Sequence, residues 1–328
     1  MYKRFYNLQR NPFEITPDPS FLFPTNRHKE ALAALYYGVR RHKGFVVLTG
    51  EVGTGKTLLV RWLLQLLKGT GVSYAYVFNS RLSSLEFLQF IAGDFGLPTL
   101  DKTKSDLLLD FGRFLINRHQ QKLTTVLVVD EAHHLPTEAL EEIRLLTNLE
   151  TAQEKLLQIL LVGQPELDEK LDLPELRQLK QRIVMRARLE PLDREETSGY
   201  IARRLQMAGA TSKAGILFPD DTIAEVYRYS RGIPRLINTI CENALITAYA
   251  RQLQSVPVDI VIEVAKDFRL NVKHWPRSER GTSHDEGENW QGRDDLLPLH
   301  SHPQGLRSRE AESVSAILPG ASKHEPYI

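Results

Sequence analysis

Short apolar runs alternate with amphipathic segments over roughly the first 190 residues of the chain. Continuous apolar character predicts buried strands at residues 45–50, 74–78, 126–129 and 157–162. A further strand is expected at "IVMRARL", 183–189. Helical spacing of apolar positions predicts helices at 26–43, 57–67 and 105–119, and others that begin at Ser84 and Thr137. Strands that alternate with helices predict an α/β fold, in which a parallel sheet is sandwiched by helices.

The pattern changes after Arg188, where helical periodicity continues without buried strands. We expect helices at 194–207, 220–229, 234–249 and 257–268, which together indicate a small all-helical domain. From residue 271 the chain is polar, rich in Gly and Pro, and without periodicity, which predicts a disordered tail. The predicted divisions are therefore 1–42 (N-terminal segment and helix), 43–190 (α/β domain), 191–270 (helical domain) and 271–328 (tail).

The composition of the chain excludes only a few classes of protein. The net charge of +1 gives the chain as a whole no electrostatic preference for nucleic acid or an acidic membrane. Cys241 is the single cysteine, so no internal disulfide can form, which suits a reducing compartment. Neither a signal peptide nor an apolar stretch of about 18 residues is visible, so we expect a cytoplasmic protein without a membrane span.

The stretch "GEVGTGKT", Gly50 to Thr57, fits a phosphate-binding loop between a predicted strand and a predicted helix. Glycines let such a loop wrap a phosphate chain with its amides inward, and the following helix adds the positive end of its dipole. Lys56 is expected to reach the β- and γ-phosphates, and the Thr57 hydroxyl to bind Mg²⁺. The residues expected at ATP from this stretch are Gly50, Glu51, Val52, Gly53, Thr54, Gly55, Lys56, Thr57 and Leu58.

The stretch "VLVVDEAHHLP" places Asp130 and Glu131 at the end of a predicted buried strand. In a protein with a phosphate-binding loop, this position puts Asp130 beside the metal and lets Glu131 polarise the attacking water. The letters Asp-Glu-Ala-His also occur in RNA helicases, which need two tandem α/β domains; only one is present here, so we reject that interpretation. His133 and His134 would point to opposite sides in extended backbone, which disfavours a shared metal.

These motifs, in this order, resemble the AAA+ ATPases. The resemblance implies that Gln164 in "LLVGQPEL" is the sensor-1 residue and that Arg235 in "SRGIPRLIN", with Pro234, contacts phosphate from the helical lid. It also implies an arginine finger that a neighbouring subunit of a ring supplies. Arg182 is our choice among Arg182, Arg186 and Arg188 in "QLKQRIVMRARL", with Arg177 in reserve.

Two further roles rest on the same resemblance. Asn79, at the end of the second predicted strand, corresponds to a polar residue that restrains the catalytic glutamate until a partner binds. Pro12 and Phe13, in "NPFEITPDP", correspond to a segment that lies over the adenine, where an aromatic ring packs well against a flat base.

Within the AAA+ ATPases, the chain is most similar to the ExeA/GspA-like secretion ATPases, including soluble members found beside exopolysaccharide systems. The resemblance is carried by "FYNLQRNPFEITPDPSFLF", "VVDEAHHL", "LLVGQPEL" and "RGIPRLINTICENAL". It implies an ATP- and Mg²⁺-dependent homo-oligomer that acts on protein partners of an envelope machine. The larger members add a transmembrane helix and a peptidoglycan-binding region that this chain lacks, so we expect action through other proteins.

Two alternatives remain open. One is a DNA-binding ATPase of the transposition type (TniB/MuB-like), whose basic surface would come from "RRHK" at 40–43 and "RQLKQR" at 177–182. Both segments are short and have acidic neighbours, which argues weakly against DNA. The other is an adaptor that binds ATP and turns it over slowly.

Overall fold

The structure is a computed structural model, and it describes residues 2–14, 21, 23–78, 82–210 and 217–270. The predicted tail and Asn79 lie outside these residues. In the part of the chain that is described, none of the helices has both the length and the hydrophobicity needed to cross a membrane.

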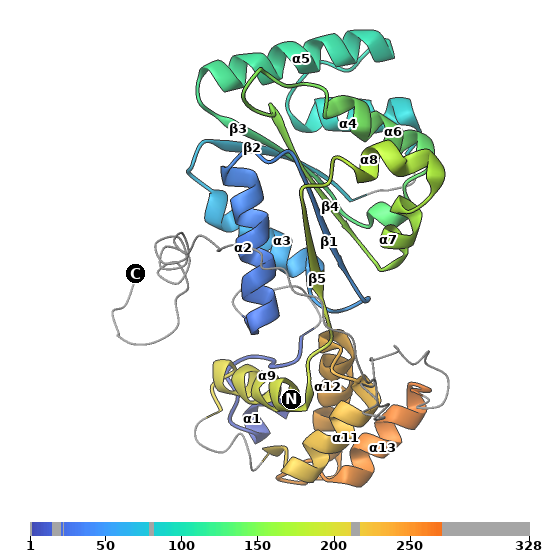
Figure 1. Ribbon diagram of the computed structural model, residues 1–328. Helices are drawn as coiled ribbons and strands as arrows, with labels where there is room; N and C mark the ends of the chain where they lie inside the picture. The colour runs from blue at the N-terminus through green and yellow to red at the C-terminus, as the bar shows by residue number, and fades with distance from the viewer. Residues whose placement is uncertain (1, 15–20, 22, 79–81, 211–216, 271–328) are drawn as a thin grey trace, which may run out of the picture. The chain divides into compact units, whose positions relative to one another are not determined.

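A parallel sheet organises the first part of the chain (Figure 1). Within the described residues it has five strands, in the order β2-β3-β4-β1-β5, and every neighbouring pair is parallel. The strands are β1 (Phe45–Gly50), β2 (Val72–Val77), β3 (Thr124–Val129), β4 (Leu157–Gly163) and β5 (Met185–Leu189). The three central strands, β3, β4 and β1, are buried along their whole length, which explains their continuous apolar sequence.

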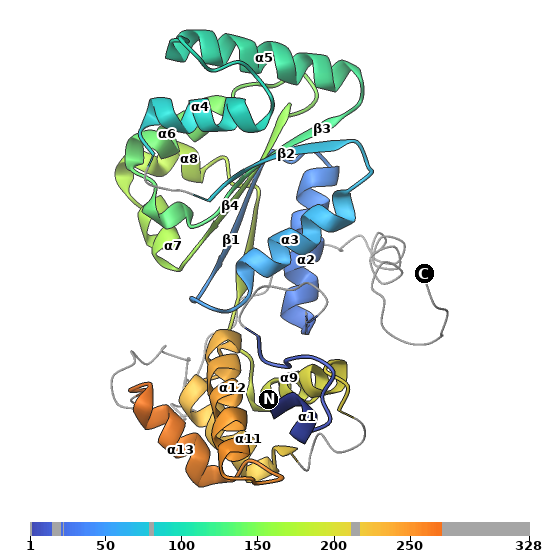
Figure 2. The same cartoon turned by 180° about the vertical axis from the view of Figure 1, so that it is seen from behind.

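Helices cover both faces of the sheet, as Figures 1 and 2 show from opposite sides. One face carries α2 (Asn26–Arg40) and α3 (Lys56–Leu67). The other carries α4 (Ser84–Asp94), α5 (Lys104–Gln120), α6 (Thr137–Leu146), α7 (Glu166–Leu171) and α8 (Arg177–Lys180). Alternate residues of one strand serve the two layers: Phe45 and Val47 face α4 to α8, whereas Val46 and Leu48 face α2 and α3. The predicted sandwich is confirmed.

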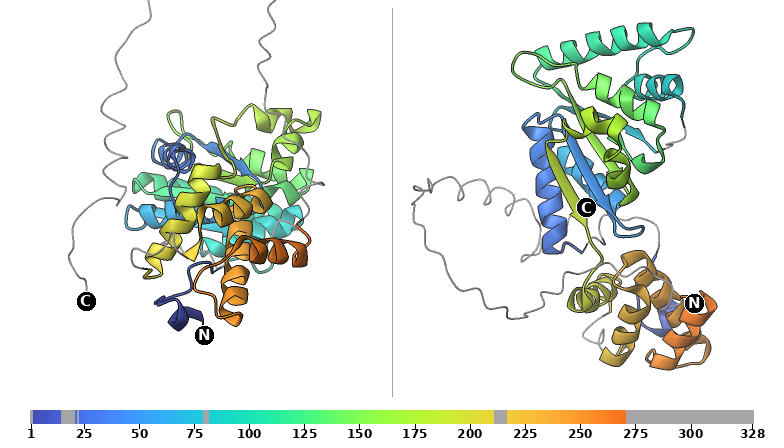
Figure 3. Two further views of the ribbon diagram at one scale, coloured as in Figure 1. Left: turned by 90° about the horizontal axis from the view of Figure 1, so that it is seen from below. Right: turned by 45° about the vertical axis from the view of Figure 1, so that its right-hand side comes forward.

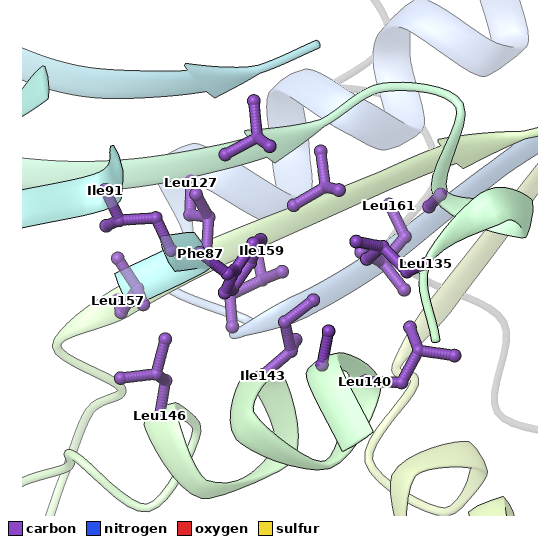
Figure 4. Packing of buried hydrophobic residues seen from close by; sticks show 14 of the residues in the cluster. Phe87, Ile91, Leu127, Leu135, Leu140, Ile143, Leu146, Leu157, Ile159 and Leu161 are labelled. Atoms are coloured by element: carbon purple, nitrogen blue, oxygen red, sulfur yellow. The ribbon is translucent and has the colours of Figure 1, made fainter. Parts of the chain in front are cut away.

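The larger of these two layers is a continuous apolar core (Figure 4). Leu127, Ile159 and Leu161 of the sheet meet Phe87 of α4 and Ile143 of α6, and each of these side chains is buried. Each buried aliphatic or aromatic side chain of this kind contributes about 1.5–3 kcal/mol of transfer free energy. This packing holds β3 and β4 rigid up to the residues that follow them.

In its described residues, the second part of the chain contains helices joined by short loops and no strand. It contains α9 (Arg194–Met207), α11 (Asp220–Ser230), α12 (Pro234–Ala250) and α13 (Val258–Asp267), seen in yellow to orange in Figure 3. These helices share a core of their own, which also takes in Tyr2, Leu8 and Phe13 from the start of the chain. The N-terminal segment, with α1 (Tyr2–Phe5), therefore packs against the helices of this lid.

Helix α2 begins with a cap that ties it to the first loop of the sheet. The Thr25 hydroxyl accepts a hydrogen bond from the His28 backbone N–H and pairs with His28 Nδ1 at 2.7 Å. His28 is 5% exposed, and this burial lowers the pKa of its imidazole, an effect partly offset by a hydrogen bond to the Thr54 backbone. The folded protein therefore favours a neutral His28.

This burial predicts a pH-dependent stability. In the unfolded chain His28 takes up a proton near pH 6.5, whereas the folded chain holds it neutral to lower pH, so stability is lost as the pH falls through that value. His28 adds at most about 1.4 kcal/mol per pH unit to this loss. We expect His28→Gln to flatten the decline of the urea unfolding midpoint between about pH 7 and 5.5. Lys29→Gln, on the exposed side of the same helix, is the control; identical slopes for His28→Gln and wild type would refute the assignment.

Candidate active site

Three strands deliver polar residues to one edge of the sheet. The loop of residues 50–57 runs from the last residue of β1 into the first turn of α3, Asp130 and Glu131 follow β3, and Gln164 follows β4. Because β4 pairs in parallel with both β3 and β1, the carboxyl ends of all three strands meet there. The sheet thus brings together residues that are more than 100 positions apart in the sequence.

The loop after β1 has the backbone of a phosphate cradle. Gly53 and Gly55 have φ values of +82° and +99°, a conformation that side-chain-bearing residues rarely adopt. Gly50 is required for close packing and not for a turn, because it is the last residue of β1. A Cβ at this position would stand 2.5 Å from the Leu189 carbonyl oxygen. Helix α3 begins directly at Lys56, so its free N–H groups lie at the cradle.

Lys56 is held inside the loop by main-chain carbonyls. Its ammonium donates to Gly50 O at 2.7 Å and to Glu51 O at 3.0 Å, and the residue is only 6% exposed. Burial lowers the pKa of this ammonium, while the nearby carboxylates of Glu131 and Asp130 act in the opposite direction. A phosphate in the cradle would offer this cation a charged partner in place of neutral carbonyls.

Asp130 is the most fully hydrogen-bonded carboxylate of the site. Its Oδ2 accepts from the Thr57 hydroxyl at 2.8 Å and from the Tyr76 phenol at 2.7 Å, while Oδ1 accepts from the Glu131 backbone N–H at 3.0 Å. Oxygen ligands of this kind, a buried carboxylate beside a threonine hydroxyl, suit a hard divalent cation. Sequence reasoning missed Tyr76, because an aromatic residue in a predicted strand is most simply read as core.

Glu131 stands in an unusual backbone conformation. Its φ of +52° is left-handed, which is uncommon for a residue with a side chain and is found at functional sites. The carboxylate is about two-fifths exposed, with Oε2 3.4 Å from Gln164 Nε2 and 3.5 Å from His133 Nδ1. Glu131 and the predicted sensor Gln164 are therefore neighbours at the edge of the sheet.

The two histidines are closer than an extended chain would allow. Residues Ala132–His134 form a turn of 3₁₀ helix (η2), and the imidazole centroids of His133 and His134 lie 3.9 Å apart. The expectation of opposite orientations was wrong, since the backbone there is helical. His133 Nδ1 lies 3.4 Å from the Gln164 backbone N–H, and burial, followed by the charge of His134, lowers the pKa of His133.

The lid touches the loop through its longest helix. The Arg235 N–H, in the first turn of α12, donates to Gly53 O at 3.2 Å, which gives a partner to one of the free donors of that helix end. A Cβ on Gly53 would lie 2.7 Å from Arg235 Cβ, so the two backbones are in close contact. Arg235 itself is exposed, whereas Pro234 begins the helix and is partly buried.

The candidate arginine fingers differ in their surroundings. The Arg182 guanidinium donates within its own chain to Thr147 Oγ1 and Arg144 O, at the end of α6. Arg186 pairs with Asp168 at 2.6 Å. The side chains of Arg177 and Arg188 are exposed, and neither forms an ion pair or hydrogen bond with another described residue.

The residues expected over the adenine lie elsewhere. Phe13 is 0% exposed, and its ring meets that of Phe218 edge-on inside the lid core, so no face is open to a base. Pro12 is buried too, and its carbonyl oxygen accepts a hydrogen bond from Arg204 at 3.0 Å. The hydrophobic pattern of the sequence near Pro12 and Phe13 could not show that these residues pack against the helices of the lid, because it reports local structure only. Asn79 lies outside the described residues, so its predicted role stays a prediction.

Comparison with known proteins agrees with this site. Residues 39–171 match the model of a protein family described as an AAA domain. The chain is 47% identical over 253 residues to general secretion pathway protein A of Aeromonas hydrophila. This match covers 76% of the chain but 45% of the relative, so the chain spans less than half the length of that protein.

Solved structures share the fold at low sequence identity. The Aeropyrum pernix ORC2 protein, in ADPNP-ADP complexes, superposes with a TM-score of 0.58 at 19% identity, covering 79% of this chain and 71% of that one. Drosophila ORC bound to DNA gives a TM-score of 0.62 at 18% identity, covering 83% and 67%. The family match, the secretion-pathway relative and the phosphate cradle lead to one conclusion: the chain belongs to the AAA+ ATPases and resembles general secretion pathway protein A.

Proposed function

We propose that the chain binds ATP with Mg²⁺ where the loop of residues 50–57 meets the first turn of α12. Main-chain amides, the N-terminus of α3 and Lys56 would hold the phosphates, and Arg235 would approach the γ-phosphate from the lid. Thr57 and Asp130 would hold the cation, which neutralises phosphate charge. The contact between Arg235 N–H and Gly53 O supports this placement, because it puts the start of the lid helix against the cradle.

Hydrolysis would depend on Glu131. Its carboxylate is about two-fifths exposed at the edge of the sheet, so a water can reach it, and Gln164 and His133 limit its orientation. A carboxylate in this place can take a proton from the attacking water or orient it toward phosphorus. Loss of the γ-phosphate would then remove a contact of the lid and change the balance between lid positions.

The resulting motion would drive or regulate assembly of an envelope secretion or exopolysaccharide-export machine. The observation that carries this proposal is the 47% identity to general secretion pathway protein A over 76% of the chain. Partners would be proteins of that machine, and the ATPase would act on them from the cytoplasmic side. Solved AAA+ structures that carry DNA share only the fold at this level of identity.

The described surface offers little support for the DNA-binding alternative. In the basic segment 177–182, Lys180 pairs with Asp172 and Arg182 is held within its own chain. In the segment 40–43, His42 Nδ1 lies 2.9 Å from Glu154 Oε2. The local partners of Lys180 and Arg182 reduce the charge that the segment 177–182 can offer to phosphates of a duplex, while Arg177 stays exposed.

For a ring, the exposed Arg177 is a better arginine finger than Arg182. Arg182 would have to break its bonds to Thr147 and Arg144 O before it could reach a neighbouring subunit. Arg177, at the start of α8, is exposed and carries no such cost. We therefore revise the assignment made from the sequence and propose Arg177.

Two substitutions separate binding from turnover. Glu131→Gln should keep ATP affinity while lowering the turnover rate by about 100-fold or more, since the water loses its base.

Lys56→Ala should weaken ATP binding by about tenfold or more, because a buried charge-assisted hydrogen bond to phosphate is lost. Binding is measured by isothermal titration and turnover by phosphate release. Glu169→Gln, exposed on α7, is the matched control; normal turnover by Glu131→Gln would remove Glu131 from the mechanism.

The arginine assignment is tested by mixing inactive subunits. Arg177→Ala protein still carries Glu131, and Glu131→Gln protein still carries Arg177, so some mixed interfaces regain both groups. We expect partial recovery of the ATPase rate when the two proteins are combined. Recovery with Arg182→Ala in place of Arg177→Ala would restore the earlier assignment. No recovery with either, from folded and assembled proteins, would show that neither arginine acts between subunits.

The cellular role is tested by comparing two classes of partner. We expect duplex DNA to leave the ATPase rate unchanged at physiological salt, and the Glu131→Gln protein to co-purify with components of an envelope export system. Stimulation by DNA, together with binding that weakens steeply as salt increases, would support the transposition-type alternative instead.

A further inference from the structure

Tyr76 contributes a hydroxyl to the site from the edge strand of the sheet. It lies on β2, opposite Val128 of β3, two residues before Asp130 in register. Its phenol donates a 2.7 Å hydrogen bond to Asp130 Oδ2, the same oxygen that accepts from Thr57 at 2.8 Å. Two hydroxyls from different elements therefore hold one carboxylate oxygen.

The position of Tyr76 is fixed from several directions. Its backbone N–H, on the edge strand of the sheet, donates to Asp94 Oδ2 at 2.7 Å. Its ring packs against the apolar layer between the sheet and helices α2 and α3. A ring held in this way keeps its hydroxyl in place without the entropy cost of a flexible side chain.

These hydrogen bonds leave one acceptor position of the Asp130 carboxylate unoccupied. A carboxylate offers about four acceptor positions. Thr57 and Tyr76 take two on Oδ2, and the Glu131 backbone N–H takes one on Oδ1. The carboxylate cannot rotate without breaking the two bonds at Oδ2. The remaining acceptor position is therefore on Oδ1, in a defined orientation.

We propose that Tyr76 is a positioning residue for the cation site: it orients the Asp130 carboxylate toward Mg²⁺ bound with ATP. The inference rests on the function proposed above and concerns this chain's own residues. A phenol on this strand orients the carboxylate before the cation arrives, so that the site needs little rearrangement on binding.

The test compares nucleotide affinity with and without the metal. A fluorescent ATP analogue is titrated into wild type, Tyr76→Phe and the control Tyr74→Phe, an exposed tyrosine of the same strand, in EDTA and in excess Mg²⁺. We expect Tyr76→Phe to bind like wild type in EDTA but to lose about fivefold or more of the gain that Mg²⁺ confers. The Mg²⁺ concentration that half-saturates the ATPase rate should increase in parallel.

The possible outcomes separate the two proposals. A purely structural Tyr76 would lower affinity equally in both conditions, leave the ratio unchanged and overturn the inference. A larger Mg²⁺-dependent gain in Tyr76→Phe would also overturn it, because the phenol would then compete with the cation for Asp130. If wild type itself shows no Mg²⁺-dependent binding, the proposed function fails, and the inference with it.

Discussion

The parallel pairing of β3, β4 and β1 is the constraint on which the site depends. It places the loop after β1 beside Asp130 and Glu131, with Gln164 from the strand between them. The apolar layers on both faces resist any shift in register, because a slip of one residue would move Val46 and Leu48 to the other layer. The polar residues can therefore be displayed on a rigid edge, where small differences in distance decide chemistry.

Hydrogen bonds hold the charged side chains of the site in place before any ligand binds. Lys56 is held by two carbonyl oxygens, and Asp130 by two hydroxyls and an amide, so neither buried charge lacks a partner. The lid joins this arrangement where Gly53 lies against Ile233 and Arg235. A phosphate chain would enter a pre-formed cradle, and its far end would lie where lid and sheet meet.

Much of the fold followed from periodicity and motif. Strand β1 has the predicted limits, and the limits of β3 and β4 differ from the predicted ones by one or two residues. These strands could be predicted because a parallel strand buried on both faces has a continuous apolar sequence. Relations that depend on tertiary packing did not follow. Phe13 joins a core more than 200 residues away, and Tyr76 and Arg182 find partners on other elements of the α/β domain. Local spacing carries no record of such partners.

In the proposed complex, one mononucleotide fold and its helical lid hold the triphosphate together. The most direct measurement is a crystal structure of the protein grown with a non-hydrolysable ATP analogue and Mg²⁺. We expect phosphates against the amides of residues 50–57, the cation at Thr57 and Asp130, and the Arg235 side chain at the γ-phosphate. An unfilled loop with the analogue bound elsewhere, or Arg235 remote from the phosphates, would contradict this expectation.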